Sequence, residues 1–586
     1  MRQWMVAAKK ADFYAIAEKF HVDPVVARII RNREVIGEKN IRIYLGGNLS
    51  DLSDPHQMKD MDRLVEILAQ KIRKQVHIRI IGDYDVDGVT SSHLFLTALR
   101  RVGAKVDVVI PHRIQDGYGL SLHLLQQAKE DGVDTILTCD NGIAAIDEIA
   151  WAKAQKMTVL VTDHHAVPFE EHEGRRTEKK SLADAVVNPH QQDCRYPYKE
   201  LCGAGVAWNV IRVLYENYDM DKREAEDLLD FVAMATVCDV MSLTGENRIL
   251  VKEGLKRIRH TKNIGLQALM QACNVQPENI SAYHFGYVLG PCVNATGRLD
   301  TARHALRLFE TGQETEAEEI ARDLVDLNQE RKELTLQGVE MAKKLCEEGG
   351  YENDPVLVLF LPDVHESIAG LIAGRIREMY NRPVFVLTRG EEEVKGSGRS
   401  TENYSMYENM CGCAELFTKF GGHPMAAGLS LPEENVEKFR RKINENCPLT
   451  VEEVCPDIHI DMAMPVGYAS TELVHQFALL EPFGKDNPSP LFADRNLSIS
   501  RMWVIGKNRN VLRMSVLSEY GQPVPVIFFG DVETLFAYFT EKFGQEEVEN
   551  ALHGRKNRIL FSMVYTAKID FYQGNENLQL EMKYYR

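Results

Sequence analysis

Short apolar runs alternate with amphipathic stretches in the first half of the chain. The runs are rich in β-branched residues and cover residues 77–82, 135–138 and 158–162. The stretches between them have apolar residues at helical spacing and cover residues 91–102, 121–130 and 144–155. This alternation predicts βαβ units around a mainly parallel sheet. The first domain is therefore predicted to be α/β.

The pattern changes twice in the second half. After residue 245 it becomes helical and ends in a long charged stretch, 314–345, typical of a helix that joins two domains. A second, smaller α/β unit follows, with apolar runs at 355–360 and 383–387 around a helical stretch at 367–380. Beyond residue 457, five short runs predict a small closed barrel of the OB type. These runs cover residues 497–504, 511–517, 524–529, 559–567 and 578–584.

A chain of 586 residues is too long for a single core, so several domains are expected. The changes in pattern divide it into five segments. They are an N-terminal helical segment (1–60) expected to pack on the first α/β domain, that domain (61–245), a helical region with the connector (246–348), the second α/β domain (349–450) and the barrel (451–586).

Acidic and imidazole side chains follow each of the three predicted strands. They are Asp83, Asp85 and Asp87 after the first, Asp140 after the second, and Asp163, His164 and His165 after the third, with Asp239 further along. Because ligands of parallel sheets gather at the carboxyl ends of the strands, these groups are expected to converge. Carboxylate oxygens with one or two imidazoles suit Mn²⁺ or Mg²⁺. The pattern therefore predicts a site for two metal ions that acts on phosphate esters.

Simpler interpretations fit less well. An EF-hand calcium loop would need a glutamate at its twelfth position, and the loop from Asp83 has none there. Gly203 and Gly205 lack the third glycine of a dinucleotide-binding loop, so a helix start packed against the metal site is the better interpretation. The eleven cysteines are scattered and predict reduced thiols, without a zinc site or a disulfide framework.

Composition is that of a globular protein, with 44% hydrophobic and 26% charged residues. No apolar stretch has signal-peptide or membrane-spanning character, so a cytoplasmic location without membrane contact is expected. The net charge of −17 is unusual for a protein that binds nucleic acid. Any nucleic-acid groove must then be a local basic feature on an acidic body.

The motifs at 83–88 and 163–165 resemble those of the DHH phosphoesterase family. Further motifs are similar to the RecJ family of bacterial single-strand-specific exonucleases within it, and they lie at 290–298, 395–400, 420–428 and 480–488. The resemblance covers nearly the whole chain in the family's motif order. It implies a DHH catalytic domain, a DHHA1-like second domain and an OB-like barrel. It also implies 5′→3′ exonuclease activity on single-stranded DNA, with release of nucleoside 5′-monophosphates, in recombination and repair.

Roles for individual residues follow from the chemistry and from the resemblance. The expected metal ligands are Asp83, Asp85, Asp87, Asp140, His164 and Asp239, with Asp140 a candidate bridge between two Mn²⁺ or Mg²⁺ ions. His165 is expected to hold the scissile phosphate or to protonate the leaving oxygen. The resemblance implies a 5′-phosphate site and an entrance loop that include Arg113, Tyr118, Asn294, Arg298, Gln329, Ser397 and Arg399. Glycines 396, 398, 421 and 422, beside His423, are candidates for a phosphate cradle.

The chain departs from the family pattern at two places. Cys292 stands where RecJ proteins usually have arginine, and residues 364–367 replace a segment that usually begins with tryptophan and histidine. Both departures affect expected DNA contacts and leave the expected metal ligands intact. The resemblance suggests a monomer, and single-strand-binding protein and a helicase are candidate partners.

Three other functions remain open from the sequence. The same metals could cleave short oligonucleotides or cyclic dinucleotides. A scaffold like the DHH relatives without metal ligands, or a DNA-binding module with structural ions, would bind without turnover. The intact ligand set favours an enzyme.

Overall fold

The structure is a computed structural model, and it describes residues 3–112, 119–172, 175–299, 302–506, 510–572 and 574–586. The chain forms two compact units. One contains residues 49–456, and the other contains residues 3–48 together with 457–586. Residues 3–48 therefore belong to the same unit as the last part of the chain.

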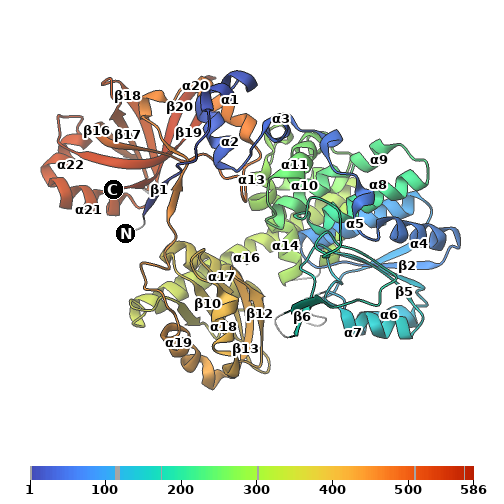
Figure 1. Ribbon diagram of the computed structural model, residues 1–586. Coiled ribbons are helices and arrows are strands. Elements are labelled where there is room, and N and C mark those ends of the chain that lie inside the picture. The colour runs from blue at the N-terminus through green and yellow to red at the C-terminus, as the bar shows by residue number, and fades with distance from the viewer. Residues whose placement is uncertain (1–2, 113–118, 173–174, 300–301, 507–509, 573) are drawn as a thin grey trace. The chain divides into compact units, whose positions relative to one another are not determined.

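The first unit contains a five-stranded sheet in which every pairing is parallel (Figure 1). In sheet order its strands are β3 (Lys105–Val109), β2 (His77–Ile81), β4 (Thr135–Cys139), β5 (Thr158–Thr162) and β8 (Ala185–Val187). The chain places β3 on one side of β2 and then returns to add β4 on the other. This reversal leaves a crevice at the carboxyl ends of β2 and β4, where such sheets bind ligands.

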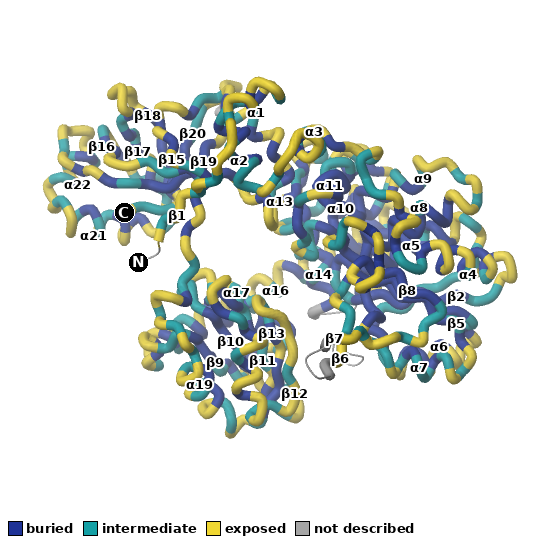
Figure 2. Tube along the Cα trace, in the orientation of Figure 1, coloured by how far each residue is buried: buried dark blue, intermediate teal, exposed yellow. Residues whose placement is uncertain are grey.

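Helices cover both faces of this sheet, as expected for parallel strands. One face carries α4 (Met61–Arg73), α5 (Val86–Arg101) and α8 (Gly203–Asn217), and the other carries α6 (Leu122–Glu130) and α7 (Ile146–Ala154). Strands β2, β4, β5 and β8 are almost wholly buried between the two layers, and edge strand β3 is half-buried (Figure 2). The predicted α/β domain and its βαβ units are thus confirmed.

A helical region follows, and its last helix joins two cores. Its main helices are α10 (Leu229–Cys238), α11 (Gly245–Ile258), α12 (Ile264–Ala272), α14 (Gly290–Leu299), α15 (Ala302–Glu310) and the 35-residue α16 (Glu314–Glu348). Ile320 and Leu324 of α16 lie in the core of the helical region, whereas Val339 and Ala342 lie in the core of the second sheet. The predicted connector helix is therefore present, and its two end parts are packed in different cores.

The second sheet has five strands and confirms the smaller α/β unit. In sheet order they are β12 (Lys419–His423), β13 (Ala426–Leu431), β11 (Val394–Arg399), β10 (Val384–Arg389) and β9 (Leu357–Phe360). Only β9 and β10 are parallel. Helix α17 (Glu366–Tyr380) packs on one face, and α18 (Met406–Cys411) and α19 (Val436–Glu445) contribute to the core on the other.

The second unit is built on a closed barrel. Its five long strands are β16 (Phe492–Ile505), β17 (Val511–Leu517), β18 (Pro523–Phe529), β19 (Leu560–Tyr572) and β20 (Asn575–Tyr585). They pair in the ring β16, β17, β18, β20, β19, and β19 returns to β16. Short strand β15 (Met462–Ala463) adds to β16, and α21 (Val532–Phe543) and α22 (Gln545–Leu552) pack on the barrel. The predicted barrel is confirmed.

Residues 3–48 of the N-terminal segment pack on this barrel, which corrects the expectation that the whole segment packs on the first α/β domain. Residues 49–60 belong to the first unit, where Leu49, Leu52 and Met58 contact its core. Strand β1 (Trp4–Val6) pairs with β14 (Ile458–Ile460), and α1 (Phe13–Phe20), α2 (Pro24–Asn32) and α3 (Glu38–Gly46) share the barrel's core with α20 (Thr471–Phe477). Arg33 forms two hydrogen bonds of 2.8 and 3.1 Å to the buried carboxylate of Asp461. The apolar face of α2 is visible in the sequence, but the element that covers it is not.

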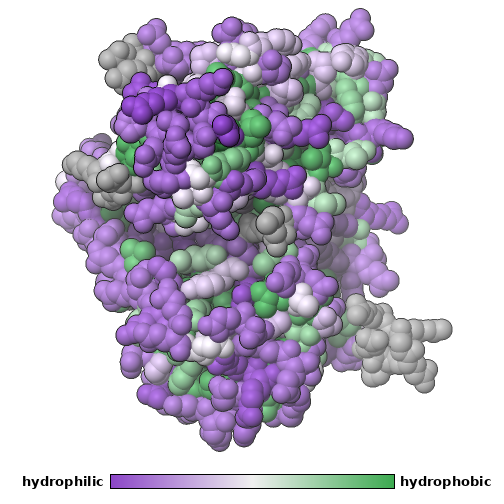
Figure 3. Space-filling model, turned by 90° about the vertical axis from the view of Figure 1, so that its left-hand side faces the viewer, coloured by the Kyte–Doolittle hydropathy of each residue, from purple (hydrophilic) through white to green (hydrophobic). Residues whose placement is uncertain are grey.

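Among the described residues, no helix combines the length and the apolar composition needed to cross a bilayer. The face of the molecule in Figure 3 is mainly hydrophilic, with hydrophobic side chains in small groups.

Replacing Asp461 by alanine should loosen the N-terminal segment, because the largely buried guanidinium of Arg33 would lose its partner. We expect a loss of about 3 kcal/mol in the free energy of opening of this segment. Native-state hydrogen exchange of the full chain, measured on peptides from α1 and α2, gives this value. Glu34→Gln removes more exposed pairs with Lys9 and Arg31 and should leave the opening of this segment nearly unchanged, because water screens these pairs. Equal losses in both variants would contradict the assignment.

Candidate metal centre and substrate surface

The loop after β2 turns directly into α5 and is held by its own side chains. Asp85 caps α5, since its Oδ1 accepts a hydrogen bond of 3.0 Å from the N–H of Gly88. A Cβ atom on Gly88 would lie 2.4 Å from the carbonyl oxygen of Asp83, so only glycine allows this tight turn. Asn294 from α14 accepts a 3.1 Å hydrogen bond from the N–H of Val86. The loop is therefore braced from α14 as well.

Asp87 is buried and bound by the N-terminus of another helix. Its two carboxylate oxygens accept hydrogen bonds from the N–H groups of Gly203 (2.6 Å) and Ala204 (2.7 Å), at the start of α8. These groups and the helix dipole both favour a negative charge. The predicted packing of this glycine segment against the metal site is confirmed, and α8 fixes the orientation of Asp87.

Asp140 lies at the end of β4 in a left-handed conformation, with φ of +60°. Its neighbour Asn141 donates hydrogen bonds to the carbonyl oxygens of Ile81 and Cys139, and so joins the ends of β2 and β4. A Cβ atom on Gly203 would lie only 2.6 Å from the Cβ of Asp140. A larger residue at position 203 would therefore displace the Asp140 carboxylate.

After β5, Asp163 orients the histidine pair. Its Oδ1 accepts hydrogen bonds from the backbone N–H groups of His164 (2.7 Å) and His165 (3.0 Å) and lies 2.8 Å from Nδ1 of His165. Its Oδ2 accepts a bond from the N–H of Ile143. Both oxygens of Asp163 therefore bind groups of the loops after β4 and β5, and they do not point into the cluster of the other carboxylates.

The strand-end groups converge as the sequence suggests. Nε2 of His164 lies 3.1 Å from Asp140 Oδ1, 3.6 Å from Asp239 Oδ2 and 3.7 Å from Asp87 Oδ2. Three overlapping sets each bring their donor atoms within 4.8 Å of one another. They are Asp140 with His164 and His165, Asp87 with His164 and Asp239, and Asp83 with Asp85 and Asp140. His164 and Asp140 each belong to two of the sets, so the arrangement has room for two adjacent cations.

The donors in this cluster fit a divalent cation. Nε2 of His164 is buried and makes no hydrogen bond among the described residues, although it faces three carboxylates. Burial lowers the pKa of His164, which keeps the ring neutral, as a metal ligand must be. Burial and the charges of Asp87, Asp85 and Asp239 raise the pKa of Asp140 well above its ordinary value. A bound cation would remove that penalty.

His165 has the opposite electrostatic character. Burial alone would lower the pKa of His165, but the hydrogen bond and charge of Asp163 raise this pKa to about 9. The same contact holds the pKa of Asp163 below its ordinary value despite complete burial. In the metal-free protein, His165 is therefore a cation at neutral pH.

The second sheet presents a row of backbone with few side chains. Ser397 of β11 pairs with Gly428 of β13, and Gly428 pairs with Gly421 of β12. A Cβ on Gly421 would meet no atom within 4 Å, and one on Gly428 would only reach a carbonyl oxygen at 4.0 Å. A hollow of about 460 Å³ lies over this row, with Lys395 and Lys419 among its lining residues. An extended chain could lie against this surface, which we call the glycine row.

The other cradle glycines, 396, 398 and 422, also have packing roles, and their part in a phosphate cradle stays a prediction. A Cβ on Gly396 would strike Leu387 at 2.4 Å, and one on Gly398 would strike Met406 at 2.5 Å. Gly422 has φ of +153°, and its Cβ would lie 2.5 Å from the carbonyl oxygen of Ala426. Side chains on a strand alternate between faces, so Gly396 and Gly398 face the core and Ser397 faces outward.

The remaining expected substrate residues are dispersed. Half-buried Arg399 donates a hydrogen bond to the carbonyl of Gly398, His423 is exposed at the end of β12, and Gln329 is exposed on α16, bonded to Glu333. Asn294 binds the loop after β2, as described above. Arg113, Tyr118 and the side chain of Arg298 lie outside the described residues.

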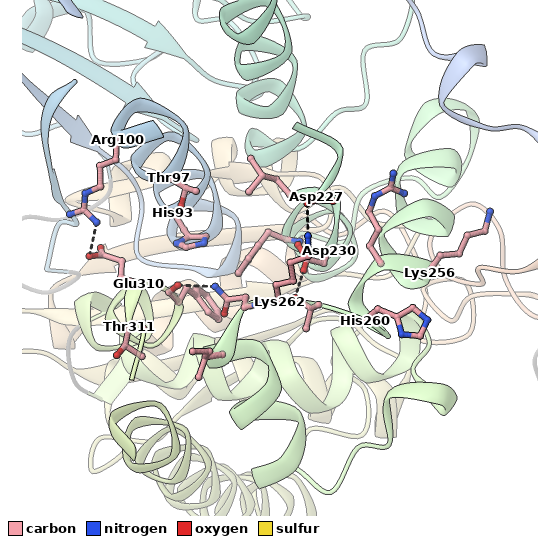
Figure 4. Close-up of a pocket in the computed structure, with 18 of the residues that line it drawn as sticks. His93, Thr97, Arg100, Asp227, Asp230, Lys256, His260, Lys262, Glu310 and Thr311 are labelled. Carbon is pink, nitrogen blue, oxygen red and sulfur yellow. Dashed lines mark hydrogen bonds and ion pairs between the residues drawn. The ribbon is translucent and has the colours of Figure 1, made fainter. Parts of the chain in front are cut away.

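A cavity of about 730 Å³ lies between α5, α10, α12 and α15 and includes none of the cluster residues (Figure 4). His93 packs there between Phe231 and Phe309, and burial lowers its pKa to about 3. Burial raises the pKa of Asp230 to about 6, although Thr261 donates a 2.6 Å hydrogen bond to it. This cavity is separate from the metal cluster.

Three family models match in chain order: the DHH family, N-terminal domain, over residues 77–236, the DHHA1 domain over 353–447, and the RecJ OB domain over 460–584. The single-stranded-DNA-specific exonuclease RecJ of Haemophilus influenzae is 32% identical over 582 residues, which cover 96% of each chain.

The chain belongs to the RecJ family. RecJ of Bacillus subtilis is also 32% identical, over 87% of this chain, and the chain spans 63% of that protein's length. The crystal structure of RecJ from Thermus thermophilus in complex with Mn²⁺ matches all of this chain and 79% of its own with a TM-score of 0.81, at 25% identity. The RecJ fold is thus shared over the full length described here.

Two functional contacts of this RecJ-family chain escaped the sequence analysis. The sequence predicted that the Gly203 segment packs against the metal site, but not that its N–H groups bind Asp87, because the two lie more than a hundred positions apart. Asp163 follows its strand like the expected ligands, and only the structure shows that it orients His165. In the sequence, this role of Asp163 was indicated only by its position directly before the two histidines.

Replacing Gly203 by alanine should disturb the metal centre of this RecJ-family chain, because the new methyl group would displace Asp140. We expect Mn²⁺ affinity to fall by about tenfold to a hundredfold, as titration calorimetry would measure. Gly205→Ala is the matched control in the same helical turn, since its Cβ would meet Leu201 at an ordinary 3.4 Å. Unchanged affinity in both variants would contradict this account of Gly203.

The charge of His165 should depend on Asp163. In metal-free protein we expect the His165 ring to titrate near pH 9, so that the imidazolium persists through neutral pH and is lost above it. Asp163→Asn removes the negative partner and should lower this pKa toward the ordinary value of about 6.5. NMR of ring-labelled histidine, with His165→Gln to assign the signal, measures both values. An identical pKa in the two proteins would refute the coupling.

Proposed function

We propose that this chain is a metal-dependent exonuclease that degrades single-stranded DNA from the 5′ end and releases nucleoside 5′-monophosphates in recombination and repair. The observation that carries the proposal is the convergence of five carboxylates and two imidazoles at the switch point of the parallel sheet. Membership of the RecJ family, whose curated members are named single-stranded-DNA-specific exonucleases, supports the same activity.

Asp83, Asp85, Asp87, Asp140, His164 and Asp239 would hold two Mn²⁺ or Mg²⁺ ions, and Asp140 is placed to be shared between them. Such ions supply charge neutralisation at the phosphate and activation of the attacking water. The chain itself keeps these donors in position. Asp87 is oriented by α8, and Asp140 by the strand-end contacts of Asn141.

His165 is the group assigned to the scissile phosphate. Its ring is about 40% exposed, whereas that of His164 is about 8% exposed, so His165 can reach a substrate at the edge of the cluster. As an imidazolium it can donate a hydrogen bond to a non-bridging oxygen or a proton to the leaving oxygen. Asp163 would act through His165 by holding its orientation and its charge.

The glycine row and Arg399 are assigned to the DNA strand and its 5′-phosphate. Bare backbone at Gly421 and Gly428 would let a sugar-phosphate chain approach closely, and Lys395 and Lys419 supply positive charge beside the hollow. Arginine suits a terminal phosphate, because its planar fork binds two oxygens. Ser397 would add a hydroxyl donor on the same face, with Arg113, Arg298, Gln329 and His423 as further contacts.

The barrel is assigned to binding the single-stranded DNA farther from its 5′ end. Four aromatic residues of the barrel are candidates for stacking on bases: Trp503, Phe528, Tyr565 and Tyr572. Phe528 and Tyr565 are buried in the core, and the side chain of Tyr572 lies outside the described residues. Trp503 is 38% exposed, with Arg501 over its ring at 5.7 Å. An exposed aromatic ring beside a cation is a sequence-tolerant platform for a base. The net charge of −17 means that such contacts must be local.

Further assignments rest on family membership. The chain would work as a monomer in the cytoplasm, where its DNA substrate lies. Single-strand-binding protein and a helicase, which expose and present single strands, are the partners proposed.

A direct test uses single-stranded DNA with a 5′-phosphate, labelled at either end, in the presence of Mn²⁺, Mg²⁺ or EDTA. We expect metal-dependent release of mononucleotides from the 5′ end, and slower release when the end is a 5′-hydroxyl. Asp140→Asn should lower the rate by about a thousandfold or more. Asp147→Asn changes an exposed carboxylate outside the cluster and should leave the rate unchanged.

Two results would overturn the proposal. Survival of long DNA alongside cleavage of dinucleotides or cyclic dinucleotides would indicate a small-substrate phosphodiesterase. Binding of DNA without any cleavage would indicate a scaffold or a binding module.

A further inference from the structure

Two cysteine side chains from different helices meet behind the catalytic loop. Cys273 follows the last residue of α12, and Cys292 lies in the first turn of α14. Their Sγ atoms are 3.8 Å apart, in van der Waals contact, whereas a disulfide bond is about 2 Å long. Both are free thiols in the structure. A small movement would therefore bring them to bonding distance.

The surroundings of this pair favour reactivity at Cys292. The hydrogen bond from Cys273, aided by Asn328 and the charges of Lys332 and Arg331, lowers the pKa of the Cys292 thiol despite its burial. Asn328 donates from Nδ2 to Cys292 Sγ over 3.3 Å. Cys292 is only 1% exposed, while Cys273 is partly exposed. A small reagent would thus meet Cys273 first, with a nucleophilic sulfur directly behind it.

We propose that Cys273 and Cys292 are a redox-sensitive pair that a low-molecular-weight disulfide converts into an intrachain disulfide bond, which slows the enzyme. This modification site is additional to the proposed nuclease function. In a cytosolic protein such a bond would be reversible and regulatory, since the thiol pool of the cell would reduce it again.

The exchange balances in two steps. The hydrogen bond to Cys292 raises the pKa of the Cys273 thiol, so Cys273 passes its proton to the Cys292 sulfur as it attacks one sulfur of the reagent. The reagent's S–S bond breaks, and the small thiolate that leaves takes the proton from Cys292 and departs as a thiol. The Cys292 thiolate then attacks the Cys273 sulfur of the mixed disulfide, the Cys273–Cys292 bond forms, and the second small thiol leaves. The two protein thiols lose two electrons and two protons, and the reagent gains both.

Helix α14 connects this pair to the metal centre. Two residues after Cys292, Asn294 accepts the hydrogen bond from the N–H of Val86, and a Cβ on Gly297 would lie 2.5 Å from the carbonyl oxygen of Tyr84. The first turns of α14 therefore touch the loop that carries Asp83, Asp85 and Asp87. Closing the sulfurs from 3.8 Å to about 2 Å must move α14, α12 or both. A shift of the loop would misplace the metal ligands.

Bond formation can be tested without any activity measurement. The reduced full chain is incubated with oxidised glutathione, its free thiols are blocked with iodoacetamide, and trypsin is added without reductant. Both cysteines lie in one tryptic peptide, residues 263–298. We expect this peptide to be unblocked and about 2 Da lighter than its reduced form, because two hydrogens have left. Exposed Cys411 should carry the mixed disulfide and thereby report that the reagent is active.

The consequence is tested on the same samples with single-stranded DNA. We expect the oxidised protein to degrade DNA at least fivefold more slowly and to recover fully with dithiothreitol. Cys273→Ser should start at the rate of the reduced protein and lose nothing on oxidation. The absence of the lighter peptide would overturn the pair itself. A lighter peptide with an unchanged rate would overturn the coupling to the metal centre, and an inactive reduced chain would count against the nuclease function alone.

Discussion

The carboxylates of Asp87, Asp140 and Asp239 all lie within 4 Å of Nε2 of His164. They repel one another, and the fold of the first unit must hold them together against that repulsion. Without a cation, repulsion and burial make the charged form of Asp140 unfavourable, as the direction of its pKa shift shows. The cluster can therefore exist only where rigid elements hold it together. A chain of loops with the same residues would separate them, because each carboxylate would gain hydration by moving away.

The surrounding elements hold these side chains in position against that repulsion. The N-terminus of α8 gives Asp87 two N–H donors, Asp163 binds the His165 ring, and Asn141 joins the ends of two strands. Glycine at position 203 lets α8 come close enough to bind Asp87 without striking Asp140. Each of these contacts orients a side chain of the site before a cation binds. Binding of the cation therefore requires little further ordering of the protein.

The sequence was informative where a local pattern decides the structure. The apolar runs before Asp83 and Asp140 predicted both the strands and the meeting of these residues, because parallel strands end at one edge. The stretch 314–345 predicted α16, which extends to Glu348. Local patterns could not show which surface covers the apolar face of α2, or that Asp87 would meet Gly203. They also could not separate Gly421, which is open, from Gly396, which faces Leu387, since strand register decides this.

The discontinuous C-terminal unit has a consequence for synthesis. Residues 3–48 leave the ribosome first, yet the barrel on which they pack begins at residue 457, about 400 residues later. At elongation rates of roughly 5–20 residues per second, this interval lasts tens of seconds. During that time the apolar faces of α1 and α2 have no partner, while residues 49–456 can already complete their own cores. The order in which this chain folds is therefore expected to differ from the order in which it is made.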